Sequence, residues 1–172
     1  MADIRTPMQW TADENAIFTE GAPWNALYPD FAAGKNVADE STDPDSLLAH
    51  YRKLIHLRNQ HAALRVGDYF PVQVDNEAIF SFLRASKEEA VLVVLNLGKD
   101  PISGFNLSLD HGPLKEAYEP VVIFREDWMT EGQVLTSPAI NAQGGFDSYR
   151  PILTNQPLPA NGSLIVQLRP IR

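Results

Sequence analysis

The residues of this 172-residue chain that offer the most distinctive chemistry are residues 5–10, which read Arg-Thr-Pro-Met-Gln-Trp. The guanidinium of Arg5 is a rigid fork of N–H donors that never loses its charge, so it can bind two hydroxyls or one carboxylate. Arg5 is therefore the sharpest candidate for a ligand contact, and the alternative is an ordinary surface arginine. Met8, Gln9 and Trp10 are expected to fix the loop that presents it.

Paired carboxyl groups are the second candidates, because retaining hydrolysis of a glycoside needs a nucleophilic carboxylate about 5 Å from a protonated acid. Adjacent acidic residues occur at positions 13–14, 39–40, 88–89 and 126–127. All four pairs lie in polar, turn-like surroundings, and nothing nearby would raise one pKa while leaving the other low. We therefore interpret them as solvated surface and not as a catalytic pair.

Four aromatic side chains, three of them in the loop-rich second half, could form a platform on which a sugar ring stacks. Loops often carry binding residues, but aromatic residues also anchor loops to a core, and packing is the favoured interpretation. Trp128 is retained as a candidate sugar contact. The residues considered for such a platform are Trp24, Trp128, Phe146 and Tyr149.

No metal or cofactor site is expected. The four histidines include no helical pair spaced i, i+4 of the kind that binds zinc, and we interpret them as solvated. Asp43 and Asp45 are too sparse for a calcium loop. The chain has no cysteine and no glycine-rich motif that would bind a nucleotide.

Charge and hydropathy exclude several classes of partner. The net charge is −8, with 22 acidic and 14 scattered basic residues, which disfavours nucleic acid. The longest apolar runs are far too short to cross a membrane, and the first residues lack the apolar region of a signal peptide. We therefore expect a cytoplasmic protein with no membrane or nucleic-acid partner.

One helix is predicted with a clear apolar stripe. Asp43 suits the N-cap and Pro44 the first helical position. Spacing of i, i+3, i+4 and i+7 continues to about Ala62 or Ala63. Residues 1–42 have no such period but are rich in proline, glycine and aromatic residues, which predicts an irregular segment. The stripe comprises Leu47, Leu48, Tyr51, Leu54 and Ile55.

From Val66 onward the apolar period changes to two, which predicts strands. Residues 90–97 are apolar and β-branched, so they should form a central, buried strand joined to residues 79–84 by a hairpin turn at 86–89. Short strands separated by turn signals indicate a mainly β fold, an antiparallel sandwich or Greek key. The other expected strands are 69–74, 102–109, 119–124, 134–136, 149–153 and 163–168.

The Arg-Thr-Pro-Met-Gln-Trp motif resembles one found in the α-amylase superfamily of glycoside hydrolases (family 13), especially in enzymes of the α-glucosidase, oligo-1,6-glucosidase and trehalose synthase types. Asn15-Ala-Ile-Phe-Thr, followed by Pro23-Trp24, resembles the next loop of that family. Residues 43–67, with their Tyr-Arg-x-Leu-Ile-x-Leu-Arg core, resemble the helix after it. The resemblance covers about residues 4–97 well and the rest loosely.

The resemblance implies that this chain is the C-terminal part of a larger enzyme. Residues 1–65 would be the end of a (β/α)8 catalytic barrel, and residues 66–172 an all-β C-terminal domain that supports it. The catalytic carboxylates would lie on the barrel, so this chain alone should be inactive. Arg5 would bind substrate only in the intact enzyme, a retaining α-glucoside hydrolase or transglucosidase.

Other interpretations remain open. The alternative function is a carbohydrate-binding β-sandwich without catalysis. The substrate could be maltose, an isomaltose-type oligosaccharide, trehalose or a short maltodextrin. The expected partners are the missing barrel and the α-glucosidic oligosaccharide. The chain by itself is expected to form a symmetric dimer through the helix or the N-terminal segment, and the alternative is a monomer in which that segment covers the stripe.

Overall fold

The structure is a computed structural model that describes residues 5–124, 126, 128–129, 135–152 and 157–171. By its internal contacts the chain divides into two compact units, residues 1–56 and 57–172. Each unit is described by itself. Among the described residues, no helix combines the length and the apolarity that crossing a membrane would require.

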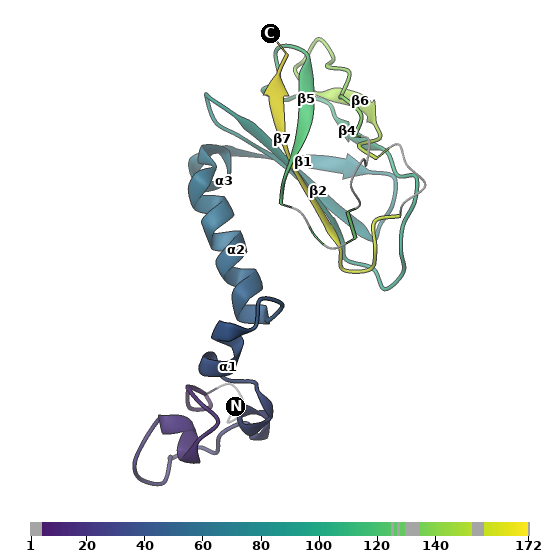
Figure 1. The fold of residues 1–172 in the computed structure, drawn as a ribbon. Coiled ribbons are helices and arrows are strands. Elements are labelled where there is room, and N and C mark those ends of the chain that lie inside the picture. Colours follow the sequence, from purple (N-terminus) through teal and green to yellow (C-terminus); the bar gives the residue numbers. More distant parts are fainter. Residues whose placement is uncertain (1–4, 125, 127, 130–134, 153–156, 172) are drawn as a thin grey trace. The chain divides into compact units, whose positions relative to one another are not determined.

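The second unit is built on a curled antiparallel sheet of seven strands in the order β5-β7-β3-β2-β1-β4-β6 (Figure 1). The mainly β fold preceded by a helix is therefore confirmed. The strands are β1 (Asp68–Val74), β2 (Ile79–Ala85), β3 (Ala90–Asn96), β4 (Leu107–Leu109), β5 (Tyr118–Phe124), β6 (Phe146–Tyr149) and β7 (Ser163–Pro170).

The predicted hairpin of β2 and β3 forms as expected. Its register runs from Ile79 opposite Asn96 to Ala85 opposite Ala90, and the turn is closed by the Ser86 N–H donating to the Glu89 carbonyl at 2.8 Å. Six of the seven residues of β3 are buried, because the strand lies between β2 and β7 and both of its faces are covered. A nearly continuous apolar sequence suits such a strand.

The core lies between two layers of the same sheet. β1 pairs with β2 along one edge and with β4 along the other. The sheet bends at β1, and β4 and β6 continue it into a second layer. Leu107 of β4 and Phe146 of β6 are fully buried in one cluster with Leu83, Leu92 and Leu164 of the other layer. The sandwich thus arises by curling of a single sheet.

Three expected strands are shorter than predicted or absent. Of residues 102–109, only the last three form a strand, while Ile102 forms an isolated bridge with Leu158. Leu135 forms an isolated bridge with Ile152, whereas Val134 and Leu153 lie outside the described residues. β6 begins three residues earlier than the expected strand and ends at Tyr149. Proline and glycine in this region limit pairing to short stretches.

The long helix α2 (Leu47–Gln60) begins later than predicted. Asp43 is not its N-cap: its side chain accepts a hydrogen bond from the Asp45 N–H at 2.9 Å, within a turn. Ser46 caps the helix instead, accepting from the Ala49 N–H at 3.1 Å. His61 is extended and ends α2, after which the short helix α3 (Ala62–Val66) follows.

The first unit is irregular, as predicted, but it also contains a short helix that the sequence pattern did not indicate. The helix α1 (Val37–Thr42) is only six residues long and exposes most of its side chains, so it has no apolar period. Two 3₁₀ segments precede it, Glu14–Ile17 and Pro29–Ala33.

Candidate substrate-binding segment

Arg5 lies on the surface of the first unit with its guanidinium unengaged. Its backbone carbonyl accepts a hydrogen bond from Asn25 Nδ2 at 3.1 Å, which ties the start of the motif to the loop twenty residues further on. The side chain is exposed and makes no hydrogen bond or ion pair with any residue that the structure describes. The fork of donors is therefore available to a ligand or to another carboxylate.

Gln9 and Trp10 hold the motif in place, the role that the sequence predicts for them. Gln9 Nε2 donates to Asp30 Oδ1 at 2.9 Å. The carbonyl oxygens of Gln9 and Trp10 accept from the N–H groups of Val37 and Ala38, at 2.9 and 3.0 Å. Because these N–H groups are the unpaired donors of the first turn of α1, the backbone of the motif completes that helix.

Asn36 organises the same region through its side chain and is only 3% exposed. Its Oδ1 accepts from the Asp39 N–H at 3.0 Å, which is the N-cap interaction of α1. Its Nδ2 donates to the Phe31 carbonyl at 2.8 Å and to Asp39 Oδ2 at 2.6 Å. Through these hydrogen bonds the buried amide holds the segment around Phe31 and the start of α1 together, a role that an apolar core has in a larger unit.

Three consecutive residues that are not glycine adopt left-handed backbone conformations. Asn15, Ala16 and Ile17 have φ angles of 52°, 50° and 54°. Such a conformation is rare for a β-branched residue such as Ile17. Ala16 is fully buried, whereas Ile17 is 62% exposed. Strained segments of this kind persist only where their surroundings fix them, and they cluster at ligand sites.

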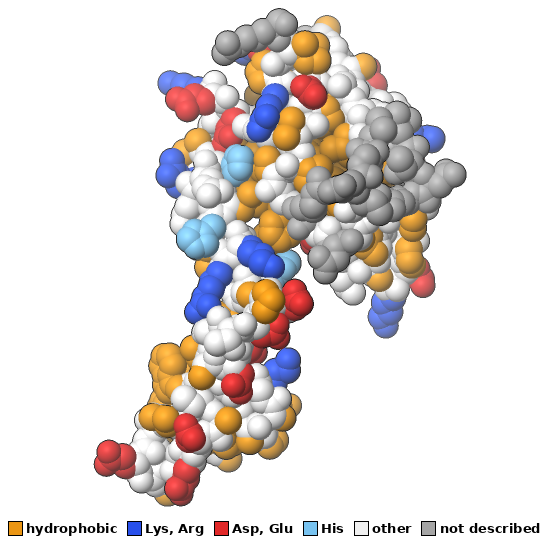
Figure 2. Space-filling model, in the orientation of Figure 1, with side chains coloured by type: hydrophobic (Ala, Val, Ile, Leu, Met, Phe, Trp, Pro, Cys, Tyr) orange, Lys and Arg blue, Asp and Glu red, His pale blue; other side chains and the backbone are white. Residues whose placement is uncertain are grey.

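Large hydrophobic side chains of the first unit lie at its surface rather than inside it (Figure 2). Among its described residues, the buried ones are Pro7, Ala16, Asn36 and Ser46. The first unit therefore has almost no hydrophobic core. The exposed large hydrophobics are Met8, Trp10, Ile17, Phe18, Trp24, Tyr28, Leu47, Tyr51 and Ile55.

A groove of about 440 Å³ runs between the motif and the start of α2. Thr6 and Gln9 line it on one side, and Leu47 and Tyr51 on the other. Trp10, which was expected to pack, is 47% exposed. Because the exposed side chains of Leu47 and Tyr51 line it, the groove adds to the uncovered apolar surface of this unit.

The interpretation of the acidic pairs as solvated surface is correct only in part. Glu40 Oε2 accepts from the Leu48 N–H at 3.1 Å, at the start of α2. Glu126 accepts from Ser163 Oγ at 2.6 Å and from Trp128 Nε1 at 2.9 Å. Each of these carboxylates holds a loop or a helix end. Leu48 and Ser163 lie 8 and 37 residues from these carboxylates in the sequence, at distances that no local pattern reveals. Asp127 lies outside the described residues.

The three aromatic candidates of the second unit, Trp128, Phe146 and Tyr149, pack in or against its core, so the packing interpretation is correct for them. Phe146 and Tyr149 are 0% and 2% exposed, with ring centroids 5.5 Å apart. Burial raises the pKa of the Tyr149 phenol, whose hydroxyl donates to the Thr136 carbonyl at 2.7 Å. Trp128 is half-buried against the core, and its indole N–H is bound by Glu126. Trp24 is 77% exposed in the other unit.

His61 departs from the solvated interpretation. His61 Nδ1 lies 3.2 Å from Glu89 Oε2, and Glu89 also accepts from the Ala63 N–H at 2.8 Å and from Gln167 Nε2 at 3.0 Å. This contact joins α3 to the turn of the hairpin. Within the part of the chain that the structure describes, no cluster of three or more His, Asp or Glu side chains could hold a metal ion.

Comparisons with known proteins point to one family. Residues 2–67 match the family model described as alpha amylase, catalytic domain. Over 96 residues the chain is 42% identical to "Probable oligo-1,6-glucosidase 2" of Bacillus subtilis (strain 168). Over 94 residues it is 40% identical to an oligo-1,6-glucosidase of Halalkalibacterium halodurans. These alignments cover 56% and 55% of the chain but 17% of each relative's length.

Solved structures match nearly the whole chain. A mutant isomaltulose synthase from Erwinia rhapontici NX5, solved with sucrose, gives a TM-score of 0.66 at 27% identity and covers 95% of this chain and 25% of that one. A mutant trehalose-6-phosphate hydrolase from Bacillus licheniformis gives 0.62 at 26% identity, with coverages of 96% and 26%. Both units of the chain therefore have counterparts in larger enzymes.

Proposed function

The chain belongs to the α-amylase superfamily of glycoside hydrolases, and from that premise we propose that it is the C-terminal part of a retaining α-glucoside hydrolase or transglucosidase. Residues 1–65 would complete the catalytic barrel, and residues 66–172 would form a β-domain that supports it. The catalytic carboxylates would belong to the barrel, so this chain alone would be inactive. We propose a cytoplasmic location for the whole protein.

The observation that carries this proposal is the exposed hydrophobic surface of the first unit. Nine large hydrophobic side chains there are between 45% and 77% exposed. Burying one such side chain stabilises a fold by about 1.5–3 kcal/mol, so leaving all nine in water is costly. An exposed hydrophobic surface of this size marks a site of contact with another protein surface. The missing barrel is the partner that fits the family.

Within the intact enzyme we assign substrate binding to Arg5. Its guanidinium is exposed and free of contacts with the described residues, while the backbone around it is fixed by Asn25 and Gln9. A donor fork on a fixed backbone can recognise a pair of sugar hydroxyls, either directly or through a carboxylate of the barrel. The names of the relatives favour oligosaccharides with α-1,6 links as the first substrates to test.

A chimeric enzyme tests this function. The matching C-terminal part of Bacillus subtilis oligo-1,6-glucosidase 2 is replaced by this chain, and turnover of a chromogenic α-glucoside and of isomaltotriose is measured. We expect the chimera to be active and the isolated chain to be inactive. Clear turnover by the pure isolated chain, or a folded chimera without any turnover, would contradict the proposal.

The role of Arg5 is tested in the same chimera. Arg5→Lys keeps the charge but loses the fork, so kcat/KM is expected to fall at least about tenfold. Lys35→Gln is the matched control, since it alters an exposed cation of the same unit. Equal activity of the Arg5→Lys variant and the control would remove Arg5 from the site.

A further inference from the structure

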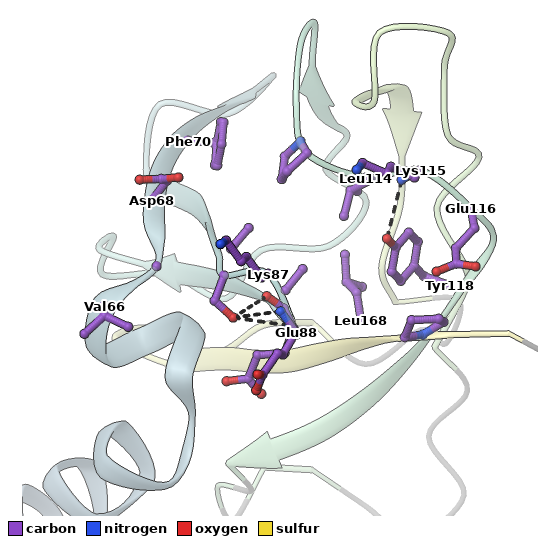
Figure 3. A pocket seen from close by; sticks show the side chains of 17 residues that line it. Val66, Asp68, Phe70, Lys87, Glu88, Leu114, Lys115, Glu116, Tyr118 and Leu168 are labelled. Carbon is purple, nitrogen blue, oxygen red and sulfur yellow. Dashed lines mark hydrogen bonds between the residues drawn. The ribbon is translucent and has the colours of Figure 1, made fainter.

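A second cleft lies wholly within the β unit, at one end of the sheet (Figure 3). It has a volume of about 550 Å³, which falls within the range of about 300–1,000 Å³ usual for small-molecule sites. The turn between β2 and β3, the start of β1 and the loop before β5 enclose it. Nothing in the proposed support role uses this cleft.

The floor of the cleft is apolar. Leu114 and Leu168 are 3% and 0% exposed, and they lie between Phe70 and Tyr118 in Figure 3. Phe70, on β1, is half-buried, so part of its ring remains open to the cleft. The arrangement offers one aromatic face over an aliphatic base, which is the lining typical of sites for small molecules.

Tyr118 adds a polar group to the wall of the cleft. The residue is 8% exposed, and its hydroxyl oxygen accepts from the Lys115 N–H at 3.4 Å. The phenol proton has no acceptor among the residues that the structure describes. An oxygen atom of a ligand in the cleft would give this proton an acceptor within the complex.

The rim is charged with both signs. Lys87 and Lys115 stand beside Asp68, Glu88 and Glu116, and all five residues are exposed. Their charged groups make no hydrogen bond or ion pair with any described residue. The two lysines offer hydrogen-bond donors and the three carboxylates offer acceptors, so the rim can serve both roles. A neutral molecule with many hydroxyls is the ligand that suits such a rim.

We propose that this cleft is a non-catalytic binding site for a glucosyl unit of an α-glucosidic oligosaccharide. The apolar face of the sugar ring would lie on Phe70, one hydroxyl would accept from Tyr118, and others would meet the charged rim. The choice of an α-linked sugar rests on the proposed function, but the cleft itself does not. The candidate contact Trp128 lies outside it.

The test is a titration of the 172-residue chain with isomaltotriose and maltotriose, followed by amide chemical-shift changes in NMR spectra. We expect saturable shifts at Phe70, Leu114 and Tyr118 in the millimolar range. Tyr118→Phe, which removes only the hydroxyl, should weaken binding about threefold to tenfold. Phe70→Leu, which keeps an apolar side chain, should weaken it about threefold or more.

Tyr69→Leu is the matched control, because Tyr69 is next in the chain but lies on the opposite face of β1 and is 50% exposed. It should leave the affinity unchanged. Absence of saturable shifts with either sugar, or equal weakening by the control, would overturn the proposal. Preference for glucose 6-phosphate over the neutral sugars would overturn the assignment of ligand class. The chimera assay does not depend on these results, so the two proposals fail separately.

Discussion

Glu89 and His61 meet side chain to side chain at a distance of 3.2 Å, and this contact joins the end of the helical segment to the hairpin turn. The same carboxylate accepts the Ala63 N–H, which is an unpaired donor of the first turn of α3. Gln167 of β7 supplies a third donor. One half-buried carboxylate therefore ties three elements together.

The first prediction is that Glu89→Ala destabilises the β unit by about 1–3 kcal/mol, because it leaves the buried Ala63 N–H and the Gln167 amide without their acceptor. Urea unfolding followed by circular dichroism measures the loss. Glu88→Ala is the control, since the Glu88 carboxylate contacts no described residue, and it should change the free energy of unfolding by less than about 0.5 kcal/mol. Equal effects of the two substitutions would contradict the role of Glu89.

Asn96 is the subject of the second prediction. It is 0% exposed, and its Nδ2 donates to the carbonyls of Asp100, Leu158 and Pro159 at 2.9, 3.1 and 2.8 Å. Asn96→Ala leaves three carbonyls without this donor, so we expect a loss of at least about 2 kcal/mol. Asn59→Ala, at an exposed helical position, should be nearly neutral. A neutral Asn96→Ala variant in urea unfolding would be the contrary result.

A pH dependence follows from Asp75. Hydrogen bonds from the Asn106 backbone N–H and side chain hold the pKa of the Asp75 carboxyl below its ordinary value of 3.8. A lowered pKa in the folded state means that the stabilisation is present above the unfolded value and is lost as the pH falls through the folded value. The difference in stability between the wild type and Asp75→Asn should therefore shrink as the pH falls below 3.8. A constant difference from pH 7 to pH 2 would refute it.

Ile17 provides the fourth prediction. A left-handed conformation costs a residue with a side chain about 1–2 kcal/mol, and glycine avoids that cost. Ile17→Gly should therefore slow hydrogen exchange at the Trp10 N–H, which donates to the Ala16 carbonyl at 3.3 Å. Ile17→Val keeps the β-branched side chain and should not slow it. Faster exchange in the glycine variant would show that the turn is not strained.

Self-association of the isolated chain is the fifth prediction. Leu47, Tyr51 and Ile55 of α2 are 66%, 58% and 56% exposed, so three of the five residues of the stripe remain uncovered, while Leu48 and Leu54 are half-buried. Light scattering over a concentration series should show a dimer, and Tyr51→Lys with Ile55→Lys should weaken it at least about tenfold. Asn59→Lys adds the same charge outside the stripe and should not. A strict monomer at high concentration would mean that the N-terminal segment covers the stripe.

The sequence pattern predicts the β unit well where the apolar alternation is long. β2, β3 and β7 each contain seven or eight residues with a regular alternation or a buried run, and they lie where expected to within two residues. β4 and β6 are shorter, and neighbouring proline and glycine residues confine their pairing, so periodicity alone overestimated the first and misplaced the second.

Helix starts and the roles of carboxylates were harder to predict, for a physical reason. Asp43 and Ser46 are both suitable N-caps for α2, and local chemistry cannot rank them. Which one caps a helix is decided by contacts such as that of Glu40 with the Leu48 N–H. The partners of Glu89 and Glu126 lie up to 78 residues away in the sequence, beyond any local pattern. The cleft at the end of the sheet is likewise assembled from four separate segments.

The position of β7 between β3 and β5 constrains how the chain can be made by a ribosome. β3 leaves the exit tunnel long before residues 163–170, yet its second edge has no partner until β7 arrives. At about 5–20 residues per second, that edge of unpaired backbone N–H and C=O groups stays open for several seconds of translation. An unpaired strand edge can pair with a strand of another chain. Nascent chains on neighbouring ribosomes of the same messenger RNA are therefore most prone to misassembly during this interval. Slow codons before residue 163 would lengthen it.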